Sequence, residues 1–194
     1  MIDGAVEETC TTDGKTEGKH CSECNEVLVE QETIPASGHN YENGICTICG
    51  EKELRLEITS QIYMIEDMYI CKVEPLTTIE EFKNGLKTNV GEIKVCDKEG
   101  KVQEDKQTVA TGMKVELKLD KEIKTFTIVV AGDTNGDGKA DFKDMISINK
   151  HRLKKKALDM EFLKAGDVNQ DNKVDIKDMI KINKYRLKKI TQLL

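Results

Sequence analysis

One 25-residue segment occurs twice near the C-terminal end of this 194-residue chain. Residues 131–155, AGDTNGDGKADFKDMISINKHRLKK, and residues 165–189, AGDVNQDNKVDIKDMIKINKYRLKK, align without a gap at an offset of 34 and are identical at 18 of 25 positions. A repeat of this length is one supersecondary unit, and a single unit cannot bury its own apolar face. The two copies must therefore pack against each other as a pseudo-twofold pair.

Each copy opens with a 12-residue loop that has the spacing of a calcium site. Ca²⁺ takes about six to eight oxygen ligands from alternate side chains of such a loop, one backbone carbonyl and a final carboxylate. The predicted ligands are Asp133, Asn135, Asp137, the carbonyl of Lys139, Asp141 and Asp144 in the first loop, and Asp167, Asn169, Asp171, the carbonyl of Lys173, Asp175 and Asp178 in the second. The sequence thus predicts two calcium ions. We expect the second loop to be slightly weaker, because its sixth residue is Asn172 where the first loop has Gly138.

A helix is predicted after each loop, with its packing face formed by Met145, Ile146, Ile148, Asn149 and Leu153 in the first copy and by Met179, Ile180, Ile182, Asn183 and Leu187 in the second. Residues 126–130 before the first loop read as a strand, so the entering helix of an EF-hand is missing. A calcium loop followed only by an exit helix, twice over residues 131–192, resembles the type I dockerin domain of cellulosomal enzymes. Aspartate at the twelfth loop position is also typical of that family. The resemblance implies an all-α domain of two calcium-loop-helix repeats.

The same resemblance implies a protein partner. Dockerins bind a cohesin module of a scaffolding protein through loop positions 10 and 11, and helix positions are secondary contacts. On this sequence the contact residues are Phe142, Lys143, Lys150, His151, Ile176, Lys177, Lys184 and Tyr185, with Arg152 and Arg186 beside them. Many dockerins have Ser-Thr at the loop positions, so the Phe-Lys and Ile-Lys pairs leave the cohesin class open. The near-identity of the copies implies that the partner can bind in two orientations.

The middle of the chain is predicted to form a small module of strands. Residues 113–119, MKVELKL, alternate apolar and charged side chains, as a half-buried strand does. Further strands are predicted over residues 54–58, 63–73, 93–96 and 126–130, and a capping box of Thr77 and Glu80 predicts a short helix that ends near Gly85. The module has no histidine and no catalytic constellation, so we expect a spacer without enzymatic activity.

The module also carries a sequence pattern, which consists of Ser60, Tyr63, Ile65, Tyr69, Ile70, Pro75, Thr77, Thr78 and Phe82. That pattern resembles an uncharacterised module that often precedes dockerins in secreted proteins of anaerobic bacteria. The resemblance implies a position in the parent protein and no activity.

Two C-x₂-C pairs lie in the first 50 residues, namely Cys21 with Cys24 and Cys46 with Cys49. They approximate the zinc-ribbon template, in which two turns aim four thiolates at one tetrahedral Zn²⁺. Cys10 and His39 are alternative ligands. The segment also resembles a repeat of secreted and surface proteins of gut Firmicutes, which implies the ligand set Cys10, Cys21, Cys24 and His39. Spacing does not decide between these sets, and disulfides are a rival to one structural zinc in an oxidising exterior.

Charge and hydropathy exclude several classes of partner. Residues 133–194 carry 15 Lys and Arg against 10 Asp and Glu, whereas residues 1–132 carry 15 against 26. The acidic cysteine-rich segment is unsuited to a phosphate backbone, and lysines 154–156 are interpreted as a solvated helix face, so we expect no nucleic-acid partner. No uncharged run approaches the roughly 20 residues of a membrane span. No signal peptide is visible, and we interpret the chain as a monomeric downstream piece of a larger extracellular protein.

Three regions are therefore expected: a small Cys-rich, zinc-ribbon-like segment over residues 1–52, a small α+β or mostly β module over residues 53–131, and an all-α dockerin over residues 132–194. The leading hypothesis is a non-catalytic module that docks a secreted, polysaccharide-degrading parent protein onto a cohesin-bearing scaffold when calcium is bound. The alternative is a calcium-stabilised structural tail of a cell-surface protein without a partner in trans. A zinc hydrolase is least favoured, because the cysteine turns predict a closed site.

Overall fold

The structure is a computed structural model that describes residues 1–193. The chain divides into two compact units, an N-terminal unit (Met1–Leu54) and a C-terminal unit (Arg55–Leu194). In the described residues, no helix combines the length and the apolar character that crossing a membrane requires.

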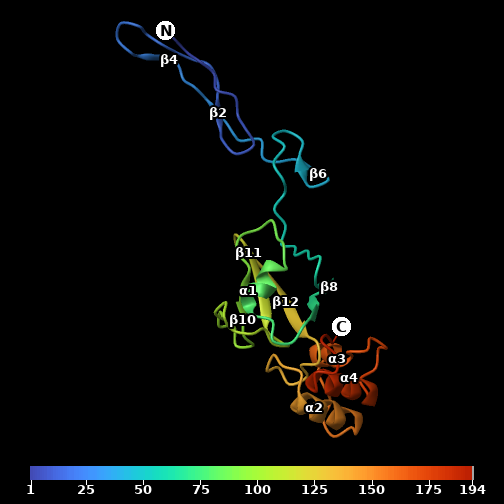
Figure 1. Ribbon diagram of the computed structural model, residues 1–194. Helices are drawn as coiled ribbons and strands as arrows, with labels where there is room; N and C mark the ends of the chain where they lie inside the picture. The colour runs from blue at the N-terminus through green and yellow to red at the C-terminus, as the bar shows by residue number, and fades with distance from the viewer. Residues whose placement is uncertain (194) are drawn as a thin grey trace. The chain divides into compact units, whose positions relative to one another are not determined.

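The N-terminal unit contains short strands and no helix (Figure 1). Its strands form three antiparallel groups: β1 (Ile2–Asp3), β3 (Gly18–His20) and β4 (Val27–Val29); β2 (Gly14–Lys15) with β5 (Thr33–Ile34); and β6 (Tyr41–Glu42) with β7 (Ile45–Cys46). Cys10 and Cys46 are the only buried side chains of apolar type within residues 1–54. This unit therefore lacks a hydrophobic core.

A five-stranded sheet forms the centre of the C-terminal unit. Its order is β10 (Lys94–Cys96), β11 (Lys114–Leu119), β12 (Glu122–Val130), β9 (Tyr69–Val73) and β8 (Met64–Glu66). β12 pairs in parallel with β9, and the other neighbours are antiparallel. The predicted alternation is confirmed in β11, where Val115 and Leu117 are buried and Lys118 is exposed.

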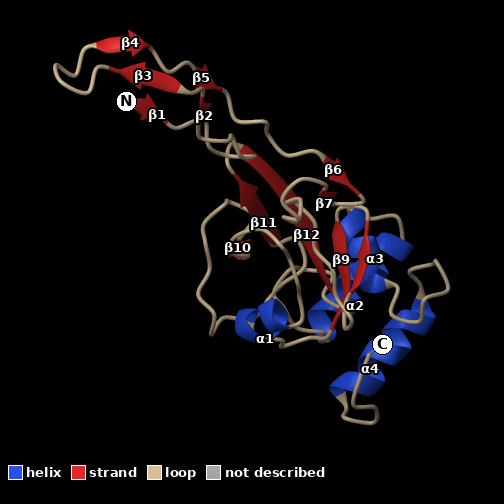
Figure 2. Ribbon diagram, turned by 90° about the horizontal axis from the view of Figure 1, so that it is seen from above, coloured by secondary structure: helices blue, strands red, loops and turns tan. Residues whose placement is uncertain are grey.

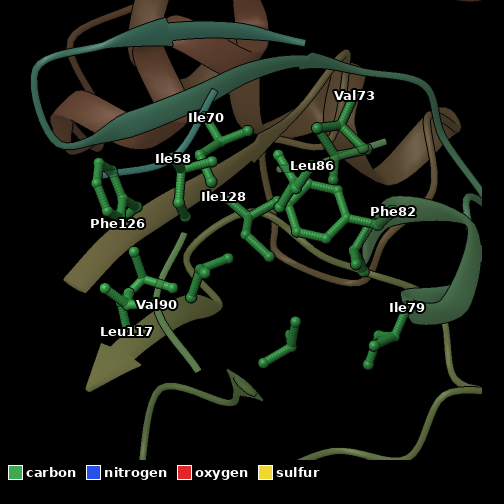
Figure 3. Packing of buried hydrophobic residues seen from close by; sticks show 14 residues of the cluster. Ile58, Ile70, Val73, Ile79, Phe82, Leu86, Val90, Leu117, Phe126 and Ile128 are labelled. Atoms are coloured by element: carbon green, nitrogen blue, oxygen red, sulfur yellow. The ribbon is translucent and has the colours of Figure 1, made fainter. Parts of the chain in front are cut away.

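The core of this unit lies between the sheet and helix α1 (Ile79–Asn84). Phe82 of the helix is fully buried with Ile70 and Ile128 of the sheet (Figure 3). Burial of a phenylalanine side chain contributes about 2 kcal/mol. The sheet and α1 are thus held by ordinary apolar packing, which the N-terminal unit does not have.

The capping box at the start of helix α1 lies one residue later than the sequence predicts. The Thr78 hydroxyl accepts the N–H of Glu81 at 3.2 Å, and the Glu81 carboxylate accepts the N–H of Thr78 at 2.9 Å. The prediction of Thr77 with Glu80 is wrong, because the Thr77 hydroxyl instead donates to the carbonyl of Glu74 at 2.8 Å. Overlapping Thr-x-x-Glu pairs fit the same pattern, and only the backbone decides which one caps.

Two of the predicted strands also differ from the structure. Residues 54–58 form no strand, although Ile58 joins the core. Residues 63–73 are divided into β8 and β9, because the chain turns at Asp67, whose φ is 51°. A continuous apolar pattern does not reveal such a turn.

Three helices follow the sheet: α2 (Phe142–Arg152), α3 (Met160–Gly166) and α4 (Ile176–Arg186). Figure 2 shows α3 beside β9. Helices α2 and α4 contact each other, and Ile148 and Ile182 are fully buried in their shared cluster. The predicted packing of the two copies is therefore confirmed.

The predicted fold class, with an all-α dockerin as a module of its own, is wrong. Helix α3 packs on β9 and β12, and its Ala165 is buried with Cys71 and Val129 of the sheet. Lys164 donates to the Glu66 carboxylate of β8 at 3.0 Å. The three helices thus belong to one mixed α and β unit with the sheet. The sheet buries the apolar side of α3, which neither copy of the repeat covers by itself.

Candidate functional site

Asp133, at the first position of the first loop, is fully buried and determines the shape of that loop. One oxygen of its carboxylate accepts the N–H groups of Gly136 at 2.7 Å and Asp137 at 3.0 Å. The other accepts those of Gly138 at 3.0 Å and Thr111 at 2.8 Å. Thr111 lies in the turn before β11, so the first loop is folded directly against the sheet module.

Asp144, at the last position of the same loop, is equally buried because it closes the first turn of α2. Asp141 is the N-cap and accepts the N–H of Lys143 at 2.7 Å. One oxygen of Asp144 accepts the N–H of Asp141 at 2.8 Å, and the other accepts that of Thr134 at 2.9 Å. The same short pattern therefore starts the helix and places two of the predicted calcium ligands.

These two carboxylates fit a hard cation. Burial, together with the nearby charge of Asp133, raises the pKa of Asp144 to about 7. Burial also raises the pKa of Asp133, against the opposing effect of its N–H donors. Neither side chain has a lysine or arginine partner in the described part of the chain. Buried charges without a positive partner are unfavourable, and a divalent ion that takes oxygen ligands removes that cost.

The second loop repeats this geometry in a more open setting. Asp178 is fully buried, burial raises its pKa, and its carboxylate accepts the N–H groups of Asn169 at 3.2 Å and Asp175 at 2.9 Å. Asp167 accepts the N–H of Asn172 at 2.8 Å. Asp167 is half-buried, whereas its counterpart in the first loop is completely covered. The two loops thus have the same fold but different access to solvent.

The remaining predicted ligands lie at the surface of the loops. Lys139 and Lys173, whose carbonyls are predicted to bind calcium, have exposed side chains. Asn135 is also exposed, and Asp137 and Asp171 are half-buried beside lysines of the following turn. The ammonium of Lys143 lies 3.7 Å from the Asp137 carboxylate, and that of Lys177 lies 3.3 Å from Asp171.

The predicted partner contacts form two matching surfaces. Phe142, the first residue of α2, is 59% exposed, and Ile176, the first residue of α4, is 54% exposed. The lysines predicted to lie beside them are all exposed, namely Lys143, Lys150, Lys177 and Lys184. Each surface therefore combines one large apolar side chain with positive charge.

Two further pairs of apolar residues belong to these surfaces. The sequence predicts that Ile146, Ile180, Leu153 and Leu187 lie on the packing face, but all four are exposed. Residues i, i+4 and i+11 share a helix face, so these side chains lie in line with Phe142 and Ile176. The helical spacing itself could have identified them. We call Phe142, Ile146 and Leu153 the first patch, and Ile176, Ile180 and Leu187 the second patch.

Two of the predicted contacts are less accessible. The Nδ1 atom of His151 accepts the N–H of Leu158 at 3.2 Å, so the ring is turned toward its own chain. Tyr185 packs against the buried cluster of α2 and α4. Both residues are half-buried beside the patches.

A second candidate site lies in the N-terminal unit, where the ligand atoms of Cys10, His39, Cys46 and Cys49 lie within 4.8 Å of one another. The set combines Cys46 and Cys49 with both predicted alternatives and does not include Cys21. Backbone N–H groups that donate hydrogen bonds to the thiol lower the pKa of Cys46 to about 5, and the N–H of Cys49 has the largest effect. Burial raises the pKa of Cys10 to about 11.

Comparison with known protein families gives one match. Residues 131–187 match the family model of the dockerin type I domain. Dockerin domains are non-catalytic, calcium-binding docking modules of secreted or cell-surface proteins, and their partners are cohesins. No curated protein and no solved structure matches this chain. The match supports a calcium-dependent docking role for this region and assigns nothing to residues 1–130.

Proposed function

We propose that the C-terminal unit docks a secreted, polysaccharide-degrading parent protein onto a cohesin of a scaffolding or cell-surface protein, with one calcium ion in each loop. The family match over residues 131–187 supports this proposal. The burial of Asp133, Asp144 and Asp178 without lysine or arginine partners in the described residues also supports it. The module binds and does not catalyse.

The observation that carries the proposal is the pair of apolar patches. Each patch begins at the first residue of a helix whose first turn is closed by a predicted calcium ligand, Asp144 in α2 and Asp178 in α4. Calcium binding therefore orders the part of the helix that presents the patch. Large exposed apolar side chains that line up on a face otherwise rich in lysine are typical of an interaction surface. Because both patches have the same layout, one partner can bind through either of them.

The direct test is calorimetry of the whole chain against a panel of cohesin modules. We expect binding to at least one cohesin in calcium and no binding in EDTA. Absence of calcium-dependent binding to every member of a broad panel would contradict docking.

Variants of the patches locate the contact. Phe142→Asp or Ile176→Asp alone should leave one patch intact and weaken binding about twofold, the statistical factor for two equivalent modes. The double variant should abolish binding, since both patches then carry a buried charge in the complex. Ile123→Asp is the matched control, because Ile123 is similarly exposed at the start of β12.

A second function is favoured by the attachment of the helices to the sheet. Thr111 donates to Asp133, and Lys164 pairs with Glu66, so calcium also braces the sheet module. On this alternative the region is a rigid structural tail of a cell-surface protein with no partner in trans. It predicts calcium-dependent melting in wild type and in the double patch variant, without binding to any cohesin.

A further inference from the structure

Four metal-binding side chains converge in the N-terminal unit. The Sγ atoms of Cys10 and Cys46 are 3.9 Å apart, and Sγ of Cys49 is 3.4 Å from Nδ1 of His39. All four ligand atoms lie within 4.8 Å of one another. In the described residues this is the one group of three or more cysteine, histidine or acidic side chains with such spacing.

These separations match the edges of a tetrahedral zinc site. With Zn–S bonds of about 2.3 Å and a Zn–N bond of about 2.0 Å, the S–S edges of a regular tetrahedron are about 3.8 Å and the S–N edges about 3.5 Å. Two of the six separations, 3.9 Å between the sulfurs of Cys10 and Cys46 and 3.4 Å between Sγ of Cys49 and Nδ1 of His39, agree with these values, and the other four are at most 4.8 Å. A disulfide between Cys10 and Cys46 would leave the thiol of Cys49 and the imidazole of His39 facing the bridge without a role.

Local backbone structure places three of the ligands. Cys46 ends β7, and its carbonyl accepts the N–H of Gly50 at 2.9 Å, which closes the turn that carries Cys49. Gly50 has a φ of 76°, a conformation that glycine adopts without strain. His39 precedes β6 and stacks on Tyr41 with a centroid distance of 5.4 Å. The hairpin of β6 and β7 thus forms one half of the site.

The orientation of His39 also fits a metal ligand. Its Nδ1 atom faces the thiols, while Nε2 lies 3.5 Å from the Glu51 carboxylate. Metal-bound histidines characteristically direct their other ring nitrogen to a carboxylate or carbonyl, which fixes the tautomer and the ring plane. Glu51 supplies such a partner from the turn that follows Cys49.

The fourth ligand comes from a distant part of the unit. Cys10 lies 36 residues before Cys46, in the loop between β1 and β2. One backbone hydrogen bond near this point joins the two parts, from the N–H of Ser37 to the carbonyl of Thr9 at 3.0 Å. Because residues 1–54 bury no apolar side chain other than Cys10 and Cys46, packing contributes little to holding these parts together.

We propose that Cys10, His39, Cys46 and Cys49 bind one structural zinc ion, and that this ion takes the place of a hydrophobic core in the N-terminal unit. The site is closed, because four protein ligands fill the tetrahedron, and it therefore lacks the open position of a catalytic zinc. Metal binding and folding are coupled in small domains of this kind. Cys21 and Cys24 form a turn of the same C-x₂-C type but lie outside the cluster.

The first test measures the zinc content of the purified whole chain. We expect one zinc per chain in wild type and in Cys21→Ser/Cys24→Ser, which is the matched control because it removes an equivalent C-x₂-C pair. Cys46→Ser/Cys49→Ser should lose the zinc. Loss of zinc from the Cys21 and Cys24 variant, or full zinc in the Cys46 and Cys49 variant, would overturn the proposed ligand set.

A second measurement does not depend on variants that could fail to fold. Cobalt-substituted wild type should show the absorption of a tetrahedral site with three sulfurs and one nitrogen, and His39→Cys should change it to that of a four-sulfur site. Glu51→Gln should weaken zinc binding roughly tenfold without changing the stoichiometry. An octahedral cobalt spectrum, or one that His39→Cys leaves unchanged, would contradict the site.

The structural role has its own readout. In a two-dimensional amide NMR spectrum, a zinc chelator that spares calcium should collapse the resonances of residues 1–54 into the range of an unfolded chain. The resonances of residues 55–193 should stay in place. An N-terminal unit that keeps its dispersed spectrum after the zinc is removed would disprove the coupling.

Discussion

The two copies of the repeat have nearly the same local structure but different surroundings. The N-cap φ is −134° at Asp141 and −139° at Asp175, and the C-cap of both helices is a leucine with nearly the same φ and ψ. The first loop, however, is covered by the sheet module through Thr111 and Asp133, whereas Asp167 at the same position of the second loop is only half-buried. The comparison shows that sequence close to a helix start sets the loop geometry, and that the environment sets which loop positions are free to vary.

The loop positions that differ most between the copies follow this rule. A Cβ atom at Gly138 would lie 2.6 Å from the carbonyl oxygen of Val109, and one at Gly136 would lie 3.0 Å from Nζ of Lys98. The second loop has Gln170 and Asn172 at these positions, with φ of 62° and 61° and exposed side chains. Both loops have a left-handed backbone at these two positions. In the first loop the neighbouring residues also leave no room for a side chain.

Of the changes considered, calcium removal should have the largest effect on the stability of the two copies. At a free calcium concentration 1,000 times the dissociation constant, each ion stabilises the fold by about 4 kcal/mol. We expect EDTA to lower the hydrogen-exchange protection of both α2 and α4, and to lower that of α4 further, because Asp167 of the second loop is less buried than Asp133 of the first. Equal protection with and without calcium would break the proposed link between the ions and the helices.

Removal of the first ligand should affect the two loops differently. Asp133→Ala leaves the buried N–H of Thr111 without its acceptor, which costs up to about 3 kcal/mol beyond the loss of calcium. Asp167→Ala should cost less in EDTA, because the N–H of Asn172 that loses its acceptor is exposed to water. The difference is measured by denaturant unfolding in EDTA, where calcium no longer contributes. Equal unfolding free energies of the two variants in EDTA would show that the sheet contact is unimportant.

Exchange of the sixth loop residue tests the role of the sheet more directly. Gly138→Asn should destabilise the protein by about 2 kcal/mol, because its Cβ meets the Val109 carbonyl. The reciprocal Asn172→Gly should change stability by less than about 1 kcal/mol, since Asn172 is exposed. Thermal unfolding in excess calcium measures both. Similar effects of the two exchanges would refute the steric argument.

The smallest effect is expected at the ion pair between α3 and β8. Glu66→Gln removes the partner of Lys164, and a partly exposed pair of this kind contributes about 0.5 kcal/mol. The loss should shrink at high salt, because screening weakens the pair. Glu92→Gln, at an exposed position, is the control. A loss that does not depend on salt would show that packing, not charge, fixes α3 on the sheet.

Several features could be predicted because they depend on neighbours in the sequence. The predicted pairing of the two exit helices is confirmed, because two copies of one apolar pattern leave each other as the natural partner. The alternation in β11 is confirmed because successive side chains of a strand point to opposite faces of the sheet. The capping box of α1 was displaced by one residue, since Thr77 and Thr78 both precede a glutamate by three positions.

The grouping of the cysteines could not be predicted from spacing. Cys21 and Cys24 have the same local pattern as Cys46 and Cys49, yet only the second pair lies beside Cys10 and His39. Which distant residues complete such a site depends on how the strands of the N-terminal unit pair. The sequence therefore identifies the candidate ligands, and the path of the chain selects among them.

The sequence alone predicted two loops with calcium spacing, the helix after each loop and the first residue of each patch, because these depend on contacts within about 12 residues. Only the tertiary structure decided that the helices share one unit with the sheet and that Cys10 lies beside Cys46. These features depend on contacts between distant segments. Such contacts form where whole surfaces are buried against each other, and a short sequence pattern does not indicate which surfaces will meet.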